Sequence, residues 1–203
     1  MGDDSTKKYY ELQAAKYAEE TLPFRLDTLW NTFSSIVSPG AYVLDLGCGS
    51  GRDLKELALR GFRVIGLEYS EPLAKIAQEY SRQKVLVGEM RVFDLGAMRF
   101  DGIWAVASLL HIPRTEVISV LKKLYEALRP KGILLTSMKK GYGNETSPNG
   151  RFFELYQPQE WEFMLKTAGF DVDGHKASTE RRQSASGEAR QIDWFVTIAR
   201  KES

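Results

Sequence analysis

Cysteine is almost absent from the sequence: Cys48 is the only one among 203 residues, so no disulfide can form within the chain. Histidine is scarce as well, with two residues, and no spacing of histidine and cysteine resembles a zinc site, so we expect no bound metal. No apolar run approaches the length of a membrane span or of a secretory signal core. These absences predict a cytoplasmic protein that does not enter a membrane.

A large excess of charge of either sign is also missing. Lys and Arg number 28 and Asp and Glu 27, which gives a formal net charge of +1. Because nucleic-acid binding calls for a basic face, this balance argues against nucleic acid as a partner. Hydrophobic residues make up 43% of the chain and charged residues 27%, as is typical of a folded globular protein. At this length we expect a single domain over residues 1–203.

The first 40 residues have helical periodicity. Over residues 5–20, apolar side chains recur at spacings of three and four along one of two stripes, Tyr9, Leu12 and Ala15 or Tyr10, Ala14 and Tyr17. A second helix is predicted over residues 24–37, before Pro39 and Gly40 stop it. We expect these helices to form a cap, residues 1–40, on a core of residues 41–203.

From residue 41 onward, short apolar runs alternate with amphipathic segments. The predicted strands are 42–46, 63–67, 85–88, 102–107 and 133–137, and the predicted helices are 52–60, 71–80 and 115–128. Such alternation indicates parallel strands with helices on both faces of the sheet. A polar loop at 139–157 and a helix at 158–168 come next. The last two predicted strands, 170–172 and 193–199, are joined by a polar connection without a helix between them, which predicts an antiparallel edge hairpin. The fold class is therefore α/β, a Rossmann-like doubly wound sheet that is mostly parallel.

A glycine turn, Gly47-Cys48-Gly49-Ser50-Gly51, follows the first predicted strand. In open α/β sheets ligands bind beyond the carboxyl ends of the strands, and glycines there let a ligand approach the backbone. The spacing is G-x-G-x-G with Arg52 next, so the dinucleotide fingerprint G-x-G-x-x-G is not met. This departure favours a nucleoside ligand that lacks a pyrophosphate, and it weakens a nicotinamide-dependent reductase as an alternative.

Two acidic residues accompany the turn. Glu68 ends the second predicted strand, where a carboxylate can accept hydrogen bonds from the ribose hydroxyls of an adenosine. Asp45 lies inside the first strand and either faces an ammonium group or organises the loop. The alternative for both is a structural role, with Glu68 as a solvated strand end and Asp45 as a cap for backbone groups.

Five motifs, in this order, resemble those of class I S-adenosylmethionine (SAM)-dependent methyltransferases: VLDLGCGSGRD, VIGLEYS, VGEMRVFDL, FDGIWAVASLLHI and LYEALRPKGILLTS. The resemblance covers about residues 41–140. It implies a methyltransferase with SAM as cofactor and S-adenosylhomocysteine (SAH) as product. The cofactor-binding residues it implies are Asp45, Gly47, Gly49 and Gly51 at the methionine part, Glu68 and the adjacent Tyr69 at the ribose, Glu89 and Met90 at the adenine, and Ala107 near the sulfonium.

The N-terminal helix is similar to cap helices of many small-molecule members of this family. Tyr9 and Tyr17 would then close over the methionine end of SAM, or they only pack the helix on the sheet. His111, which follows the fourth predicted strand, is the candidate catalytic base, with packing under the cofactor as the alternative.

The segment 139–157 is longer than ordinary connections, which suits a cover over a substrate. We expect Phe152, Phe153 and Tyr156 to shape the acceptor pocket; the alternative is a surface loop that these aromatic residues anchor. A small-molecule methyl acceptor is the first prediction. RNA or protein as acceptor, or a domain that binds SAM without transferring methyl, remain the alternatives.

Overall fold

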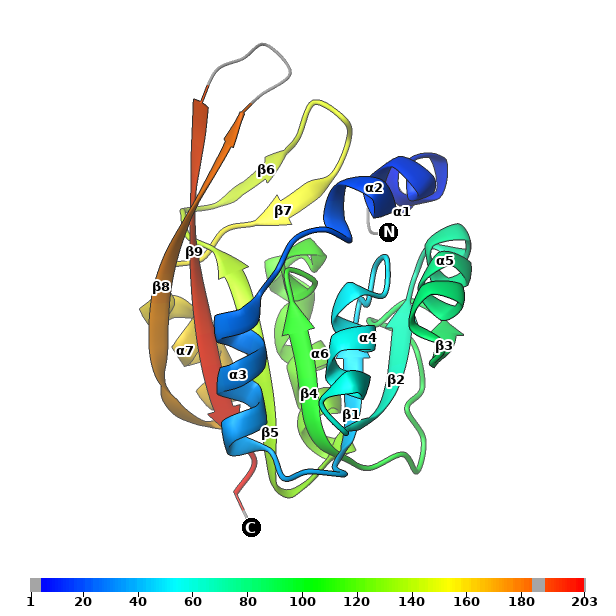
Figure 1. Cartoon of the computed structure of the whole chain (residues 1–203). Coiled ribbons are helices and arrows are strands. Elements are labelled where there is room, and N and C mark those ends of the chain that lie inside the picture. The colour runs from blue at the N-terminus through cyan, green and yellow to red at the C-terminus, as the bar shows by residue number, and fades with distance from the viewer. Residues whose placement is uncertain (1–4, 184–188, 203) are drawn as a thin grey trace.

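The computed structural model describes residues 5–183 and 189–202, and its centre is a seven-stranded sheet with the order β3-β2-β1-β4-β5-β9-β8 (Figure 1). The strands are β1 (Tyr42–Leu46), β2 (Arg63–Glu68), β3 (Lys84–Val87), β4 (Phe100–Val106), β5 (Leu128–Lys139), β8 (Asp171–Gln183) and β9 (Ala189–Arg200). The first five are parallel, and β9 is antiparallel to both β5 and β8. The predicted doubly wound sheet with an antiparallel edge is confirmed.

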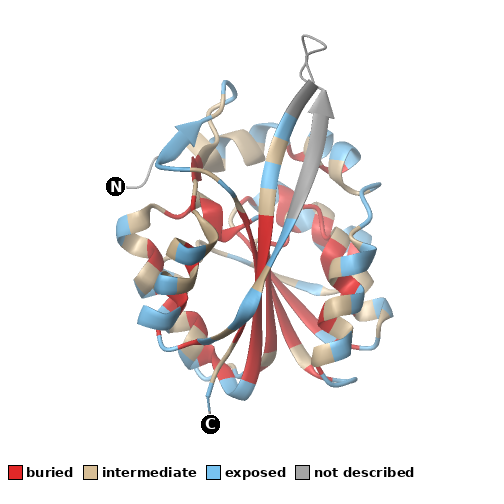
Figure 2. Ribbon diagram, turned by 90° about the vertical axis from the view of Figure 1, so that its left-hand side faces the viewer, coloured by how far each residue is buried: buried red, intermediate tan, exposed pale blue. Residues whose placement is uncertain are grey.

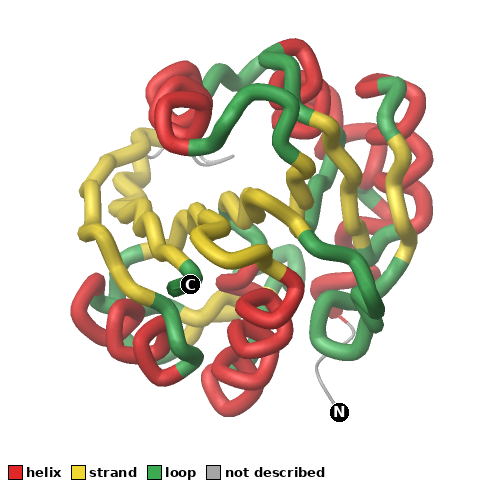
Figure 3. Tube along the Cα trace, turned by 90° about the horizontal axis from the view of Figure 1, so that it is seen from below, coloured by secondary structure: helices red, strands yellow, loops and turns green. Residues whose placement is uncertain are grey.

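Helices cover both faces of this sheet (Figure 3). They are α1 (Ser5–Leu12), α2 (Ala14–Thr21), α3 (Asp27–Ile36), α4 (Arg52–Leu59), α5 (Glu71–Ser81), α6 (Arg114–Ala127) and α7 (Pro158–Thr167), with a short 3₁₀ helix, η1 (Leu109–His111), after β4. Among the described residues, none of these helices is long and apolar enough to cross a bilayer.

Alternate residues of each strand contribute to two separate cores, because successive side chains of a strand point to opposite faces. In β4, Ile103 belongs to the core beneath α6 and α7, whereas Trp104 belongs to the core beneath α3 and α4. Both are fully buried, and Figure 2 shows the strands as the most buried part of the molecule. Burial on both faces explains why the parallel strands read as continuous apolar runs.

The N-terminal region differs from the predicted cap. The single helix expected over residues 5–20 is divided at Gln13 into α1 and α2. The helix α3 is part of the layered core, since Trp30 and Phe33 are 2% and 0% exposed and pack against the sheet. Only α1 and α2 lie across the carboxyl ends of the strands, where they can reach a ligand (Figure 1).

Two segments have more strand than expected. The segment 139–157 contains a hairpin of β6 (Asn144–Thr146) and β7 (Phe152–Glu154), and β8 and β9 have 13 and 12 residues. The outer parts of β8 and β9 pair with each other beyond the main sheet (Figure 1). The sequence of these outer parts lacks the apolar run that marks a buried strand, so it did not predict the full length of the two strands.

Candidate active site

A cavity of about 450 Å³ lies at the carboxyl ends of β1, β2 and β4, and residues of α1 and α2 also line it. Ten residues singled out from the sequence line it: Tyr17, Gly47, Gly49, Glu68, Tyr69, Glu89, Met90, Ala107, His111 and Phe152. Five others lie outside its lining: Tyr9, Asp45, Gly51, Phe153 and Tyr156. The motifs therefore converge on one cavity, and the five outliers have other places in the structure.

The turn after β1 depends on three left-handed glycines, with φ of +70° at Gly47, +54° at Gly49 and +84° at Gly51. A Cβ on Gly47 would lie 2.6 Å from Cβ of Ser108, and one on Gly51 would lie 2.8 Å from the backbone of Ala77 in α5. Both the backbone angle and these contacts exclude larger residues. Gly47 and Gly49 border the cavity, whereas Gly51 lets α5 pack against the turn. The place of Gly51 at the cofactor stays a prediction.

Glu68 connects the glycine turn to the start of α5. Its Oε2 accepts a hydrogen bond from the backbone N–H of Gly49 and its Oε1 accepts one from Ser70, both at 2.9 Å. Burial raises the pKa of Glu68, and the backbone donors only partly oppose this shift. The carboxylate thus organises the cavity wall and still offers acceptor lone pairs to a bound ligand.

Asp45 lies beneath the turn and not in the cavity wall. It is 2% exposed, and its pKa is raised well above the ordinary value, first by burial and then by the neighbouring charge of Asp53. Asp53 itself accepts hydrogen bonds from the indoles of Trp30 and Trp104, at 2.9 and 3.1 Å, and from Arg52. Sequence reasoning missed Asp53, because its two tryptophan partners come from α3 and β4, far away in the chain.

The acid expected at the adenine is already paired. Glu89 forms an ion pair with Arg91, whose Nη1 also lies 3.4 Å from Glu116. The ammonium of Lys123 donates to the backbone carbonyls of Met90 and Arg91, at 3.1 and 2.5 Å. These contacts fix the loop after β3 along one wall of the cavity, and Arg91 is a lining residue that the sequence motifs did not indicate.

The end of β4 forms another wall. Ala107 adopts a left-handed backbone with φ of +54°, and its N–H donates to Oγ of Ser137 at 3.2 Å. This turn places Ser108 at the cavity, and among the described residues the buried Oγ of Ser108 has no hydrogen-bond partner. Because buried hydroxyls are normally paired, this atom is available to a polar group of a ligand.

The two N-terminal helices present the second of the two possible stripes. Tyr10 and Tyr17 line the cavity and Ala14 between them is buried, whereas Leu12 of the other stripe is 70% exposed. The ring of Tyr9 contacts the edge of Tyr10 and lies outside the cavity lining. Tyr10 therefore takes the place at the cavity that the sequence resemblance gave to Tyr9.

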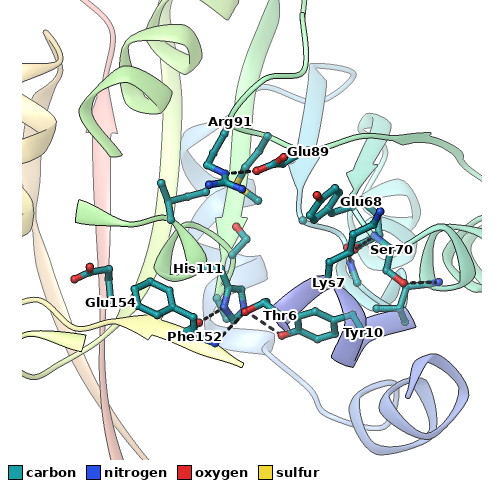
Figure 4. Close-up of a pocket in the computed structure, with 18 of the residues that line it drawn as sticks. Thr6, Lys7, Tyr10, Glu68, Ser70, Glu89, Arg91, His111, Phe152 and Glu154 are labelled. Atoms are coloured by element: carbon teal, nitrogen blue, oxygen red, sulfur yellow. Dashed lines mark hydrogen bonds and ion pairs between the residues drawn. The ribbon is translucent and has the colours of Figure 1, made fainter. Parts of the chain in front are cut away.

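His111, in η1, has both ring nitrogens engaged (Figure 4). Its Nδ1 lies 2.6 Å from the carbonyl oxygen of Phe152, and its Nε2 lies 3.0 Å from the hydroxyl of Tyr10. Burial lowers the pKa of His111 to about 4, and the charges of Arg151 and Lys139 act in the same direction. The imidazole is therefore neutral near pH 7 and acts there as a hydrogen-bonding group.

The hairpin β6–β7 contributes through only one of its faces. Phe152 and Glu154 line the cavity, whereas Phe153 packs beside the ring of His111, with 5.0 Å between ring centroids. Tyr156 is fully buried and packs on Trp161 at 5.1 Å. Phe153 and Tyr156 lie outside the lining of this cavity, because alternation along β7 turns Phe153 away and Tyr156 belongs to the hydrophobic core. Their part in shaping the acceptor pocket stays a prediction.

The hairpin and α1 together border the cavity. The hydroxyl of Ser5 donates to the carbonyl of Gly150 at 2.6 Å, and the N–H of Phe152 donates to Oγ1 of Thr6 at 2.9 Å. Figure 4 shows Thr6 and Tyr10 of α1 beside Phe152 and His111. Segments that lie about 145 residues apart in the chain therefore meet at the cavity.

These walls fit a nucleoside joined to an amino acid, as in SAM. Glu68 offers carboxylate lone pairs, Ser108 offers an unpartnered hydroxyl, and the turn at Gly47 and Gly49 has no Cβ to keep a ligand from the backbone. Within the described part of the chain, no group of three or more His, Cys, Asp or Glu side chains could hold a metal ion.

Residues 43–132 match a protein family described as a methyltransferase domain. An O-methyltransferase of Penicillium expansum is 26% identical over 171 residues, which are 76% of this chain but only 61% of that protein. The crystal structure of a Burkholderia thailandensis 1,6-didemethyltoxoflavin-N1-methyltransferase, with its substrate and SAH bound, superposes with a TM-score of 0.74, at 20% identity over 98% of this chain and 88% of that one.

A third structure has the same fold under a different activity name. The [4+2]-cyclase SpnF superposes with a TM-score of 0.77, at 16% identity over 98% of this chain and 96% of that chain. At this identity the likeness shows the fold alone. The motifs and the matched domain nevertheless agree: residues 43–132 are similar to a methyltransferase domain, and the described part of the chain has the fold of SAM-dependent methyltransferases.

Proposed function

We propose that this chain is a cytoplasmic enzyme, with residues 1–203 as one methyltransferase domain, that transfers the methyl group of SAM to a small-molecule acceptor. The observation that carries the proposal is the cavity itself, because one side has the glycine turn and Glu68, and the other has aromatic and polar groups. Its volume of about 450 Å³ falls within the range of small-molecule sites. The names of similar proteins, such as the 1,6-didemethyltoxoflavin-N1-methyltransferase, support the same acceptor class.

In this proposal each wall has its own task. When bound, SAM supplies a methyl group that its sulfonium has already activated for transfer. Gly47, Gly49 and Glu68 hold the cofactor, with Tyr17, Tyr69, Met90 and Ala107 as further contacts, and Phe152 and His111 border the acceptor. Aligning the acceptor and excluding water then supply most of the catalysis.

The hydrogen bonds and the pKa of His111 do not favour the base role predicted for it. An imidazole with a pKa of about 4, bonded at both nitrogens, has little capacity to keep a proton at pH 7. We therefore propose that His111 positions its neighbours and does not act as the general base.

The test of the proposal combines binding with turnover. Saturation with SAH at a hundredfold above its dissociation constant stabilises a protein by about 2.7 kcal/mol, which for this chain length raises the Tm by roughly 5–10 °C, whereas NAD should leave it unchanged. Labelled SAM incubated with a small-molecule extract should then yield labelled product. No shift with millimolar SAM or SAH would overturn the cofactor assignment.

A second candidate, a domain that binds SAM without transferring methyl, is favoured by one observation. The cyclase SpnF has the same fold at a TM-score of 0.77, so the fold does not by itself require methyl transfer. Strong SAH binding without label transfer to small-molecule, RNA or protein fractions would favour this candidate.

A further inference from the structure

The hydrogen bonds that lead from the hairpin to the cavity have a fixed direction. The carbonyl of Phe152 can only accept, so Nδ1 of His111 carries the ring proton and donates it across 2.6 Å. In a neutral imidazole the other nitrogen, Nε2, is then an acceptor. Across 3.0 Å the hydroxyl of Tyr10 must therefore be the donor to Nε2 (Figure 4).

The charged neighbour of Tyr10 does not reverse this direction. The positive charge of Arg151 acts on the phenol, and a guanidinium can donate a hydrogen bond but cannot accept one. Burial raises the pKa of Tyr10 well above its ordinary value, so the phenol keeps its proton. With that proton committed to His111, the oxygen of Tyr10 can only accept a hydrogen bond from a molecule in the cavity.

The charges that line the cavity favour the same kind of acceptor molecule. Both lining cations have carboxylate neighbours: Lys7 lies 3.6 Å from Glu11, and Arg91 is paired with Glu89. Glu154 also lines the cavity, is 5% exposed, and is ion-paired with Arg114 at 3.5 Å. An anionic acceptor would therefore find the lining cations Lys7 and Arg91 already paired with carboxylates.

We propose that the methyl acceptor is a small alcohol, phenol or amine that donates a hydrogen bond to the oxygen of Tyr10, and that carboxylates and phosphates are poor acceptors. This inference rests on the proposed function and names the substrate class of the same cavity. Tyr10 contacts the acceptor, and His111 is a positioning residue that fixes the direction of the Tyr10 hydroxyl.

The atoms balance for a hydroxyl or amine acceptor. The acceptor heteroatom forms its new bond to the methyl carbon, and the C–S bond breaks with its electron pair left on sulfur. For a hydroxyl, the O–H bond breaks as the new bond to carbon forms, and the proton is lost to water while Tyr10 and His111 keep their own protons. For an amine, the product ammonium loses its proton to water.

The first test is independent of turnover. Protein labelled with ¹⁵N-histidine contains two histidines, and the signals of His111 are identified by their loss in His111→Asn. At pH 7, with SAH bound, we expect a neutral ring protonated at Nδ1 and unprotonated at Nε2. A ring protonated at Nε2, alone or together with Nδ1, would overturn the inference.

The second test measures binding of matched probes to SAH-saturated protein: benzyl alcohol, benzylamine and benzoate. We expect the alcohol and the amine to bind more tightly than benzoate, and Tyr10→Phe to weaken the alcohol about 2–10-fold, the size of one hydrogen bond, without affecting benzoate. Tyr142→Phe is the control, since Tyr142 is 81% exposed and outside the cavity lining.

Three outcomes would contradict the inference. The first is that benzoate binds as tightly as benzyl alcohol, and the second is that Tyr10→Phe keeps the parental preference among the probes. The third is that all three probes bind with the same affinity or that none of them binds. Failure of the proposed function itself is distinguished beforehand, because SAH would then not bind to the parent protein, or labelled SAM would give no labelled small-molecule product.

Discussion

Replacing Glu68 by alanine should damage both the folded state and the cofactor site, because one carboxylate serves both. Two backbone donors, from Gly49 and Ser70, bond to its two oxygens at 2.9 Å. Hydrogen bonds to a charged group contribute about 1.5–3 kcal/mol each. The full loss is offset in two ways: water in the cavity can satisfy the freed N–H groups, and the desolvation that raises the pKa of Glu68 disappears.

The expected net loss for Glu68→Ala is about 1–3 kcal/mol of unfolding free energy, or a Tm lower by roughly 2–12 °C for a chain of this length. Loss of the ribose contact should in addition weaken SAH binding by about 1.5–3 kcal/mol, roughly 10–150-fold. Glu68→Gln should recover at most one of the two backbone bonds, because its amide NH₂ would face a backbone N–H donor.

Differential scanning calorimetry measures the first effect and isothermal titration with SAH the second. Glu79→Ala is the matched control, since it removes the same charge from an exposed position of α5. If Glu68→Ala melts and binds SAH as the parent does, the carboxylate neither organises the turn nor holds the ribose, and the reasoning is refuted.

Three further changes test the architecture around this site. Burial raises the pKa of Asp45, so the folded state holds this proton more tightly than the unfolded chain does, and stability is lost as pH rises from about 4 through the raised pKa. Denaturant titrations of Asp45→Asn and of the parent at pH 5 and pH 8 test this. The difference in stability in favour of Asp45→Asn should be larger at pH 8 than at pH 5. Gly47→Ala should weaken SAH binding at least about tenfold, because its Cβ would meet Ser108 at 2.6 Å, whereas Gly61→Ala, also left-handed but with nothing within 4 Å, should keep parental affinity. Asp53→Ala should cost about 3–5 kcal/mol in urea unfolding, since two buried indole donors and one guanidinium lose their acceptor; a loss below about 1 kcal/mol would contradict this role.

Local chemistry made several features predictable. The left-handed angles of Gly47 and Gly49 follow from a tight turn after a buried strand, and the place of Glu68 follows from the parallel register of β2 with β1, so the sequence predicted this side of the cavity. The edge hairpin was predictable in kind and not in length, because the apolar run marks only the part of β9 that pairs with β5.

Partners from distant segments were not predictable. Either stripe of α1 and α2 satisfied the same periodicity, and only docking on the sheet decided that Tyr10, and not Tyr9, faces the cavity. Likewise the sequence identified His111 but not its bonds to Tyr10 and Phe152, which lie 101 and 41 residues away along the chain.

The sequence by itself therefore determined the sheet, the glycine turn and the carboxylate beside it, because each depends on residues that are neighbours along the chain or in adjacent parallel strands. The tertiary structure alone decided the acceptor side of the cavity, where α1, η1 and β7 meet. Contacts between such segments depend on how whole elements pack, and periodicity along one element carries no information about which residue of another it will touch.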